Sequence, residues 1–214
     1  MPDQTNDRTQ PDVSKVEDTR DQATFEAIAR PSDPSGAAPQ ETPAVTPSTG
    51  THYDAIVLGG GMAGVPLAHR LAYKGFKTAL IERAELGGTC LNRGCIPTKT
   101  MIASARVAHQ AYLSEQWGVE TGEVRVNLSR VVDRKDELIR SVRSGSERNV
   151  AQNQNVTLIR GNARFTGERR LVVNGEEITA DKVFIAVGTR NSVPPIEGLE
   201  SVPYLDSTSA MELR

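Results

Sequence analysis

Residues 53–82 show the apolar pattern of a strand, a helix and a second strand. Residues 53–58 and 77–82 are short β-rich apolar runs, and the first of them ends in glycines. Between them, residues 62–73 repeat apolar side chains at helical spacing, and Gly75 follows as a favourable helix end. A unit of this length predicts two parallel strands joined by a crossover helix.

Two further helices are predicted after this unit. Pro97 stands near the start of the first helix, which we extend to about Gln116, and Gly118 stops it. Residues 128–152 predict a long, strongly charged helix. Its expected buried side consists of Val131, Val132, Leu138, Ile139 and Val142.

The remaining pattern consists of short β-like runs. They cover residues 156–160, 163–165, 170–173, 176–179 and 182–187. Asn174-Gly175 between two of these runs is a strong hairpin signal. The last run is apolar and leads into Gly188, so we expect a buried strand. The chain is therefore predicted to be an α/β protein with a parallel sheet and an added antiparallel β-hairpin.

Residues 1–50 have a different composition from the rest of the chain. They hold seven of the twelve prolines and a single aromatic residue, Phe25. Such a segment buries too little apolar surface to offset the entropy of ordering, so we expect a disordered leader that deletion would not harm. The folded domain is expected over residues 51–214.

Charge and apolar content exclude several classes of partner. The net charge is −2, which gives no footprint for nucleic acid or an anionic membrane. The leader has neither the apolar run nor the basic start of a secretory signal, and no run approaches the ~18 apolar residues that span a bilayer. We therefore expect a cytoplasmic protein with a small-molecule substrate.

The first strand runs into the sequence GGGMAG, which fits a GxGxxG turn. Gly59 allows the tight turn, Gly61 lets a pyrophosphate approach the backbone, and Gly64 lets the helix pack on the strand. Glu82 follows Gly59 by 23 residues at the end of the second strand, where a carboxylate accepts hydrogen bonds from a ribose. This context predicts a Rossmann-like dinucleotide site and does not separate FAD from NAD. The alternative is a glycine-rich surface turn with a solvated glutamate.

The only two cysteines, Cys90 and Cys95, lie in the sequence GTCLNRGCIPTK at residues 88–99. The four-residue gap suits a turn that brings them together at a helix start, where thiolates are stabilised. A low-pKa dithiol beside a flavin is suited to reversible two-electron transfer. An inert structural pair and half of a zinc site are the alternatives. Zinc takes four ligands, and the three histidines (His52, His69 and His109) show no ligand spacing.

Residues 53 to about 206 resemble the FAD domain of the pyridine nucleotide–disulfide oxidoreductases, which include dihydrolipoamide dehydrogenase, glutathione reductase and mercuric reductase. The stretch at residues 88–99 is very similar to the redox motif of that family. Residues 99–107 and the charged helix after them look closest to mercuric-reductase-like members. The absence of paired cysteines in residues 1–52 weakens the mercury interpretation, because mercuric reductases often carry such a module there.

The resemblance implies roles for individual residues. Cys90 would be the interchange thiol that meets substrate, and Cys95 the thiol nearer the flavin. Residues 179–188 resemble the second FAD fingerprint of the family, which ends at Gly188 beneath the cofactor. The candidate cofactor-binding residues are therefore Gly59, Gly61, Gly64, Glu82, Arg83, Gly88, Thr89, Lys99, Ala163 and Gly188. No metal ligand is assigned.

The resemblance also implies a reaction. Electrons would pass from NAD(P)H through FAD to the Cys90/Cys95 disulfide and on to a disulfide or mercuric-ion-type substrate. Relatives continue into NAD(P)H-binding and dimerisation domains and are homodimers, and the NAD(P)H site and the dimer domain have no counterpart in these 214 residues. We therefore expect a fragment or truncated chain that is not a competent enzyme alone. An inactive FAD-binding module and a flavin-free redox-sensing or interaction protein are the alternatives.

Overall fold

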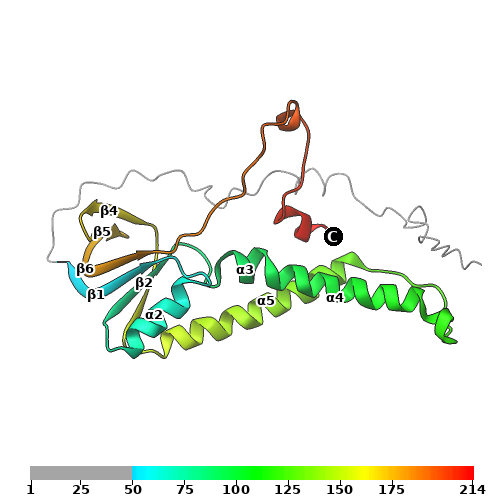
Figure 1. Ribbon diagram of the computed structural model, residues 1–214, viewed down its shortest axis with the longest axis horizontal. Coiled ribbons are helices and arrows are strands. Elements are labelled where there is room, and N and C mark those ends of the chain that lie inside the picture. Colours follow the sequence, from blue (N-terminus) through cyan, green and yellow to red (C-terminus); the bar gives the residue numbers. More distant parts are fainter. Residues whose placement is uncertain (1–49) are drawn as a thin grey trace, which may run out of the picture.

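The computed structural model describes residues 50–214 as an α/β fold with a sheet, covering helices and a long returning C-terminal segment (Figure 1). The leader predicted over residues 1–50 lies, apart from Gly50, outside the described residues. Among the described helices, none is both long enough and apolar enough to cross a membrane.

One six-stranded sheet forms the centre of the fold, in the order β3-β2-β1-β6-β5-β4. The first four strands in this order are parallel, and β5 pairs antiparallel with both β6 and β4. The α/β class with an added antiparallel hairpin is thus confirmed. The strands are β1 (Thr51–Leu58), β2 (Thr78–Glu82), β3 (Val156–Arg160), β4 (Ala163–Gly167), β5 (Arg170–Val173) and β6 (Glu176–Ile185).

Helices lie on one face of the sheet and extend beyond it (Figure 1). The crossover helix α2 packs on β1 and β2, and the long helix α5 leads directly into β3. Two further helices, α3 and α4, meet at a kink and lie beside α5. Their bounds are α2 (Gly64–Tyr73), α3 (Gly88–Arg93), α4 (Cys95–Tyr112) and α5 (Leu128–Ala151), with short 3-10 turns η2 (Ser114–Trp117), η3 (Leu199–Ser201) and η4 (Ser209–Glu212).

Alternate side chains of β1 belong to two separate hydrophobic clusters, one on each face of the sheet. Ile56 and Leu58 pack with residues of β2, β5 and β6 on one side of the sheet. Val57 points to the other side and packs with Ala68 and Ala72 of α2. The sheet is therefore buried on both faces near β1, as parallel sheets require.

The predicted hairpin is confirmed. Asn174 and Gly175 both have positive φ angles, 53° and 85°, which is what a tight turn between twisted strands needs. The Asn174 side chain also donates to the carbonyl of Arg160, 2.7 Å away. The predicted return strand and the last predicted strand are one continuous element, β6.

Several predicted helix bounds are wrong. Helix α2 begins at Gly64 rather than at residue 62, and α4 begins at Cys95 and ends at Tyr112. The residues after it form the 3-10 turn η2, and Gly118 ends that turn with a φ of 73°. The short helix α3 was not predicted, because a six-residue element with two glycines at its flanks has no measurable apolar period.

The predicted buried side of α5 is partly wrong. Val132 and Ile139 are buried as expected, but Leu138 and Val142 remain 41% and 40% exposed. The position between the two buried residues on the same face is Lys135, whose side chain is only 1% exposed. Val132, Lys135 and Ile139 follow one another at three- and four-residue spacing, so they lie on one face of α5. A prediction based on apolar residues alone does not assign a lysine to that buried face.

The end of β6 also departs from the prediction of a buried strand. Ile185 is 68% exposed, and Val187, just past the strand, is 67% exposed. Ile185 pairs with Leu58, the last residue of β1, so both residues lie at the carboxyl edge of the parallel strands. The exposure leaves an apolar edge beside the glycine turn.

Gly64 is the glycine whose substitution we expect to cost the most stability. An added Cβ would lie 1.7 Å from the Gly59 carbonyl oxygen, which is backbone and cannot move aside cheaply. We expect Gly64→Ala to lower the free energy of unfolding by about 1–3 kcal/mol, the usual cost of overpacking. Urea unfolding of the apoprotein measures it. Gly145→Ala, in the open middle of α5, is the matched control and should be neutral or stabilising; equal behaviour of the two variants would contradict the predicted contact.

Candidate functional site

The carboxyl ends of β1 and β6 meet at the point where the strand order reverses, which is where open α/β sheets bind ligands. Gly59 follows β1 with a φ of 101°, and a Cβ there would lie 2.3 Å from the Ala186 carbonyl oxygen. Only glycine allows β1 to turn this close to the chain that leaves β6. The turn then enters α2, whose N-cap residue Ala63 makes no side-chain cap.

A large open cavity begins at this turn. Its volume is about 940 Å³, within the range of ligand sites, and it runs from the glycine turn past α3 to the returning C-terminal segment. A second cavity of about 440 Å³ adjoins it over the ends of β1 and β2 and reaches Ala163. Both are lined by Gly59, Glu82, Arg83 and residues 187–190.

Glu82 is held by the backbone of two loops. One carboxylate oxygen accepts from the Gly60 amide at 2.7 Å, and the other accepts from the Ala84 amide at 2.8 Å. These bonds fix the orientation of the carboxylate between the glycine turn and the loop after β2. Each oxygen retains a lone pair, so the group can still accept a ribose hydroxyl from the cavity.

Gly61 and Gly88 face each other across the mouth of the turn. An added Cβ on Gly88 would lie 2.8 Å from the Gly61 Cα, and Gly88 has a φ of 58°. Gly61 differs, because its added Cβ would meet only the Gly88 Cα at 3.6 Å, an ordinary contact. Nothing within the described chain therefore requires glycine at residue 61, and the open space before it belongs to the cavity.

The two cysteines lie on either side of the kink between α3 and α4. Cys90 is in the first turn of α3, and Cys95 is the first residue of α4. Gly94 makes the kink, and a Cβ there would lie 3.0 Å from the Thr89 carbonyl oxygen. Both cysteines are free thiols, with Cys90 half-buried and Cys95 exposed.

The pKa of the Cys90 thiol is raised, which corrects the prediction of a low-pKa dithiol. The main cause is the hydrogen bond between the side chains of Cys90 and Cys95, followed by burial and by repulsion between the two sulfurs. The Lys99 ammonium lowers the pKa, but it is the smallest contribution. The protonated form of the Cys90 thiol is therefore favoured.

The loop that carries the cysteines is braced from α5. Asn92, between the two cysteines, donates to the carbonyls of Leu86 and Gly88, each 3.0 Å away. Its side-chain oxygen accepts from Arg143 Nε at 3.1 Å, and Arg143 also pairs with Glu85 at 3.1 Å. Sequence reasoning missed Arg143, which lies 51 residues from its partner.

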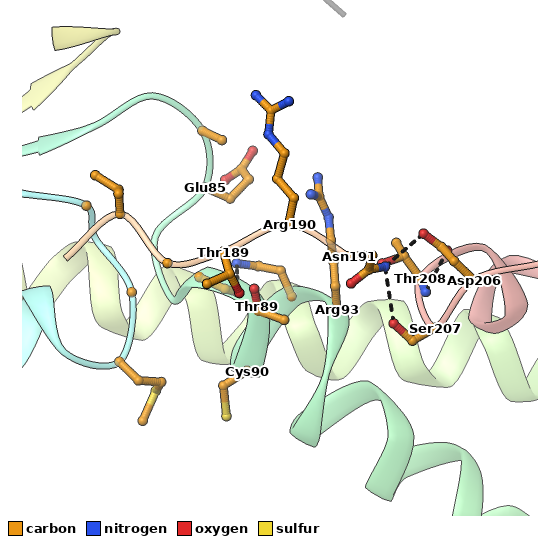
Figure 2. A pocket seen from close by; sticks show the side chains of 18 of the residues that line it. Glu85, Thr89, Cys90, Arg93, Thr189, Arg190, Asn191, Asp206, Ser207 and Thr208 are labelled. Atoms are coloured by element: carbon orange, nitrogen blue, oxygen red, sulfur yellow. Dashed lines mark hydrogen bonds between the residues drawn. The ribbon is translucent and has the colours of Figure 1, made fainter. Parts of the chain in front are cut away.

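Residues 205–208 form the far wall of the cavity, next to Asn191 (Figure 2). Asp206 organises this wall, since one carboxylate oxygen accepts from the amides of Thr208 and Ser209, and the other accepts from Asn191 Nδ2. The bond from Ser209 is the largest cause that lowers the pKa of Asp206. The wall was not predicted.

Asp206→Asn should loosen this wall at neutral pH but not in strong acid. A carboxyl with a lowered folded-state pKa stabilises the fold above its ordinary pKa of about 3.9, and that contribution is lost as the pH falls through the folded-state value. We expect the variant to lower the Tm by about 2–4 °C at pH 7, the effect of a lost cap. Thermal unfolding followed from pH 7 to pH 3 measures it; a difference that grows in acid would contradict the assignment.

Most sequence-predicted residues gather at the two cavities, and three do not. The lining includes Gly59, Gly61, Glu82, Arg83, Gly88, Thr89, Cys90, Ala163 and Gly188. Gly64 lies behind the turn as a packing residue. Cys95 and Lys99 are outside both linings, although both act on the Cys90 thiol.

Four arginines and four acidic residues (Glu82, Glu85, Asp206 and Glu212) line the larger cavity. Arg83, Arg93 and Arg190 line it and form no salt bridge within residues 50–214. Figure 2 shows Arg93 and Arg190 extending from opposite segments toward the same side of the cavity. These three guanidinium groups are available to bind an anionic ligand. Within the described residues, no group of three or more His, Cys, Asp or Glu side chains is placed to hold a metal ion.

Comparison with known proteins places this arrangement in context. The family model described as pyridine nucleotide-disulphide oxidoreductase matches residues 53–214. The chain is 36% identical to a mercuric reductase of Bacillus cereus over 162 residues, and 39% identical to a dihydrolipoyl dehydrogenase of Acholeplasma laidlawii over 149 residues. Among solved structures, it is similar to the HOCl-induced flavoprotein disulfide reductase RclA from Escherichia coli, with 37% identity and a TM-score of 0.63.

These matches cover most of the chain but a minor part of each relative. The alignments span 76%, 69% and 75% of this chain and 26%, 44% and 34% of the mercuric reductase, the dihydrolipoyl dehydrogenase and RclA. The range matched by the family model, residues 53–214, includes the glycine turn, both cysteines and the returning segment.

Proposed function

Because the chain belongs to the pyridine nucleotide-disulphide oxidoreductase family, we propose that it binds FAD in the two adjoining cavities and works as a disulfide oxidoreductase through Cys90 and Cys95. One observation carries the proposal. A single cavity joins the glycine turn to Cys90, so a dinucleotide held at the turn reaches the thiol.

The residues present fit a flavin dinucleotide. The open space before Gly61 and the uncapped start of α2 suit a pyrophosphate, and the unpaired arginines add positive charge. Glu82 is oriented toward the ribose position, and the smaller cavity beside Ala163 suits the adenine. Bound FAD would carry electron pairs between a nicotinamide donor and the disulfide.

The dithiol performs the exchange with substrate. Cys90 gives up its proton as its sulfur attacks one sulfur of a substrate disulfide and forms a mixed disulfide. The released substrate sulfur takes up that proton and leaves as the first thiol. Cys95 then attacks the Cys90 sulfur, releases the second thiol and closes the Cys90–Cys95 disulfide. Two electrons and two protons leave the protein in this exchange, and a bound flavin would supply the electrons that reopen the disulfide.

The roles of the two cysteines follow from their hydrogen bond. The pKa of the Cys90 thiol is raised, chiefly by its hydrogen bond with the Cys95 side chain, so Cys90 favours its protonated form. This supports Cys95 as the sulfur beside the flavin and Cys90 as the sulfur that meets substrate. A long-wavelength absorption of thiolate beside flavin should then survive Cys90→Ala and disappear in Cys95→Ala.

We propose a small disulfide as the substrate class, with a thiophilic metal ion as the second candidate. The second rests on the dithiol itself, because two adjacent thiolates chelate soft cations, and on the mercuric reductases among the relatives.

Titration of the purified apoprotein with FAD tests the proposal. We expect quenching of flavin fluorescence with a stoichiometry of one FAD per chain, and no response to free NAD at the same concentration. Reduced protein should then convert a small aromatic disulfide to thiol, two equivalents per chain. Failure of FAD to bind at high micromolar concentration would reject the cofactor assignment.

A further inference from the structure

Lys135 is a buried charge that the proposed chemistry does not use. Its ammonium donates to the Met211 carbonyl oxygen at 3.0 Å and to a carboxylate oxygen of Glu212 at 2.8 Å, and Asp136 lies 2.9 Å away. An unpaired buried ammonium costs several kcal/mol, so these partners are what permit lysine in the stripe between Val132 and Ile139.

Two of the partners of Lys135, Met211 and Glu212, belong to the returning C-terminal segment, whereas Asp136 is its neighbour on α5. After β6 the chain swings away from the sheet, passes η3 and comes back to end against the helices (Figure 1). Residues 205–208 and Glu212 line the larger cavity, so the segment that Lys135 holds is also the cavity wall. The other contacts that dock η4 are weaker or more exposed: Thr98 with the Met211 sulfur at 3.4 Å, and Arg214 with Asp133 and Asp136.

We propose that Lys135 is a positioning residue of the cofactor site, an inference that rests on the proposed function. Through Met211 and Glu212 it fixes residues 205–212 against α5 and sets the far wall of the cavity. It also neutralises Glu212, one of the two carboxylates that this segment brings to the cavity, the other being Asp206.

The second role separates Lys135 from a residue that only supports the fold. Without its ammonium, Glu212 would present an unpaired negative charge to a ligand that carries a pyrophosphate. Loss of Lys135 should therefore weaken FAD binding through charge as well as through position, and the charge part should be screened by salt. A purely structural lysine would give no such salt dependence.

The experiment compares Lys135→Met, Lys135→Arg and wild type. Met removes the charge but nearly keeps the side-chain length, whereas Arg keeps the charge. We expect Lys135→Met to weaken FAD binding about tenfold or more at low salt, with a smaller loss at 0.5 M salt, and Lys135→Arg to recover most of the affinity. Hydrogen exchange at residues 205–212 should be faster in Lys135→Met and near wild type in Lys135→Arg. Lys74→Met, the same change on an exposed lysine at the end of α2, is the control and should leave both readouts unchanged.

Each outcome decides the proposal. Affinity within about twofold of wild type, or unchanged exchange at residues 205–212, would overturn it. If Lys135→Met does not fold, Glu212→Gln replaces it; this half-exposed change should still speed exchange at residues 205–212, and unchanged exchange would again overturn the proposal. If wild type takes up no FAD, the proposed function fails, while the exchange measurements still decide whether Lys135 holds the segment.

Discussion

Gly61→Val will abolish FAD binding while leaving the fold of the apoprotein intact. A side chain at residue 61 projects into the cavity, where its only neighbour at Cβ is the Gly88 Cα at 3.6 Å. It would occupy the space that a pyrophosphate needs at the start of α2. We expect the dissociation constant for FAD to rise about a hundredfold or more. Fluorescence titration measures the affinity, and urea unfolding of the apoprotein measures the fold.

The contrast with two other glycines makes this prediction specific. Gly64→Ala should lose stability without a ligand, because its Cβ meets backbone, and Gly145→Val should change neither stability nor affinity strongly. Gly61→Val should lower the affinity for FAD without changing the stability of the apoprotein. Normal flavin uptake by this variant would show that the glycine turn is not the cofactor site.

Cys90→Ser and Cys95→Ser will each eliminate the reversible disulfide. Only the pair can lose two hydrogens together, so in a glutathione redox buffer each single variant should form mixed disulfides and no internal bond. Alkylation followed by mass measurement gives the populations. Wild type unfolded in urea is the control, because it holds the same cysteines without the kink at Gly94. A wild-type chain that forms no internal disulfide under native conditions would contradict the redox assignment.

The raised pKa of Cys90 predicts an asymmetry between the variants. Cys95→Ala removes the hydrogen bond that is the largest cause of the shift, so the pKa of Cys90 should fall toward its ordinary value. At pH 7.5 more thiolate then forms, and Cys90 should react several-fold faster with iodoacetamide than it does in reduced wild type. A slower reaction would show that Cys95 does not hold the proton of Cys90 in place.

The parts of the fold and site that sequence predicted are those set by neighbouring residues. The glycine turn is one, because Gly59 and Gly64 are required by contacts within a few residues of each other. The Asn174-Gly175 turn is another, because its positive φ angles restrict the residue types. The family resemblance supplied the redox motif, whose cysteines sit at adjacent helix starts.

The parts that were missed depend on tertiary contacts. Arg143 contacts Asn92, 51 residues away in the sequence, and Lys135 contacts Glu212, 77 residues away. No local sequence pattern predicts either pair. The wall around Asp206 forms only after the chain has swung out and returned. Charge on α5 was visible in the sequence, but which charged side chains turn inward depends on the segments packed against the helix.

Helix α5 therefore sets the spacing between three tertiary contacts. Along its 24 residues, Lys135 fixes the returning segment, Arg143 fixes the cysteine loop, and Glu147 pairs with Arg160 of β3 at 2.6 Å. The relative positions of these contacts are fixed by helix geometry, a rise of about 1.5 Å and a rotation of about 100° per residue. The helix can accept many exchanges on its exposed side, but one inserted residue between Lys135 and Arg143 would rotate the two contacts out of alignment. The number of residues between these side chains therefore matters more to the fold than the residue types on the exposed side of α5.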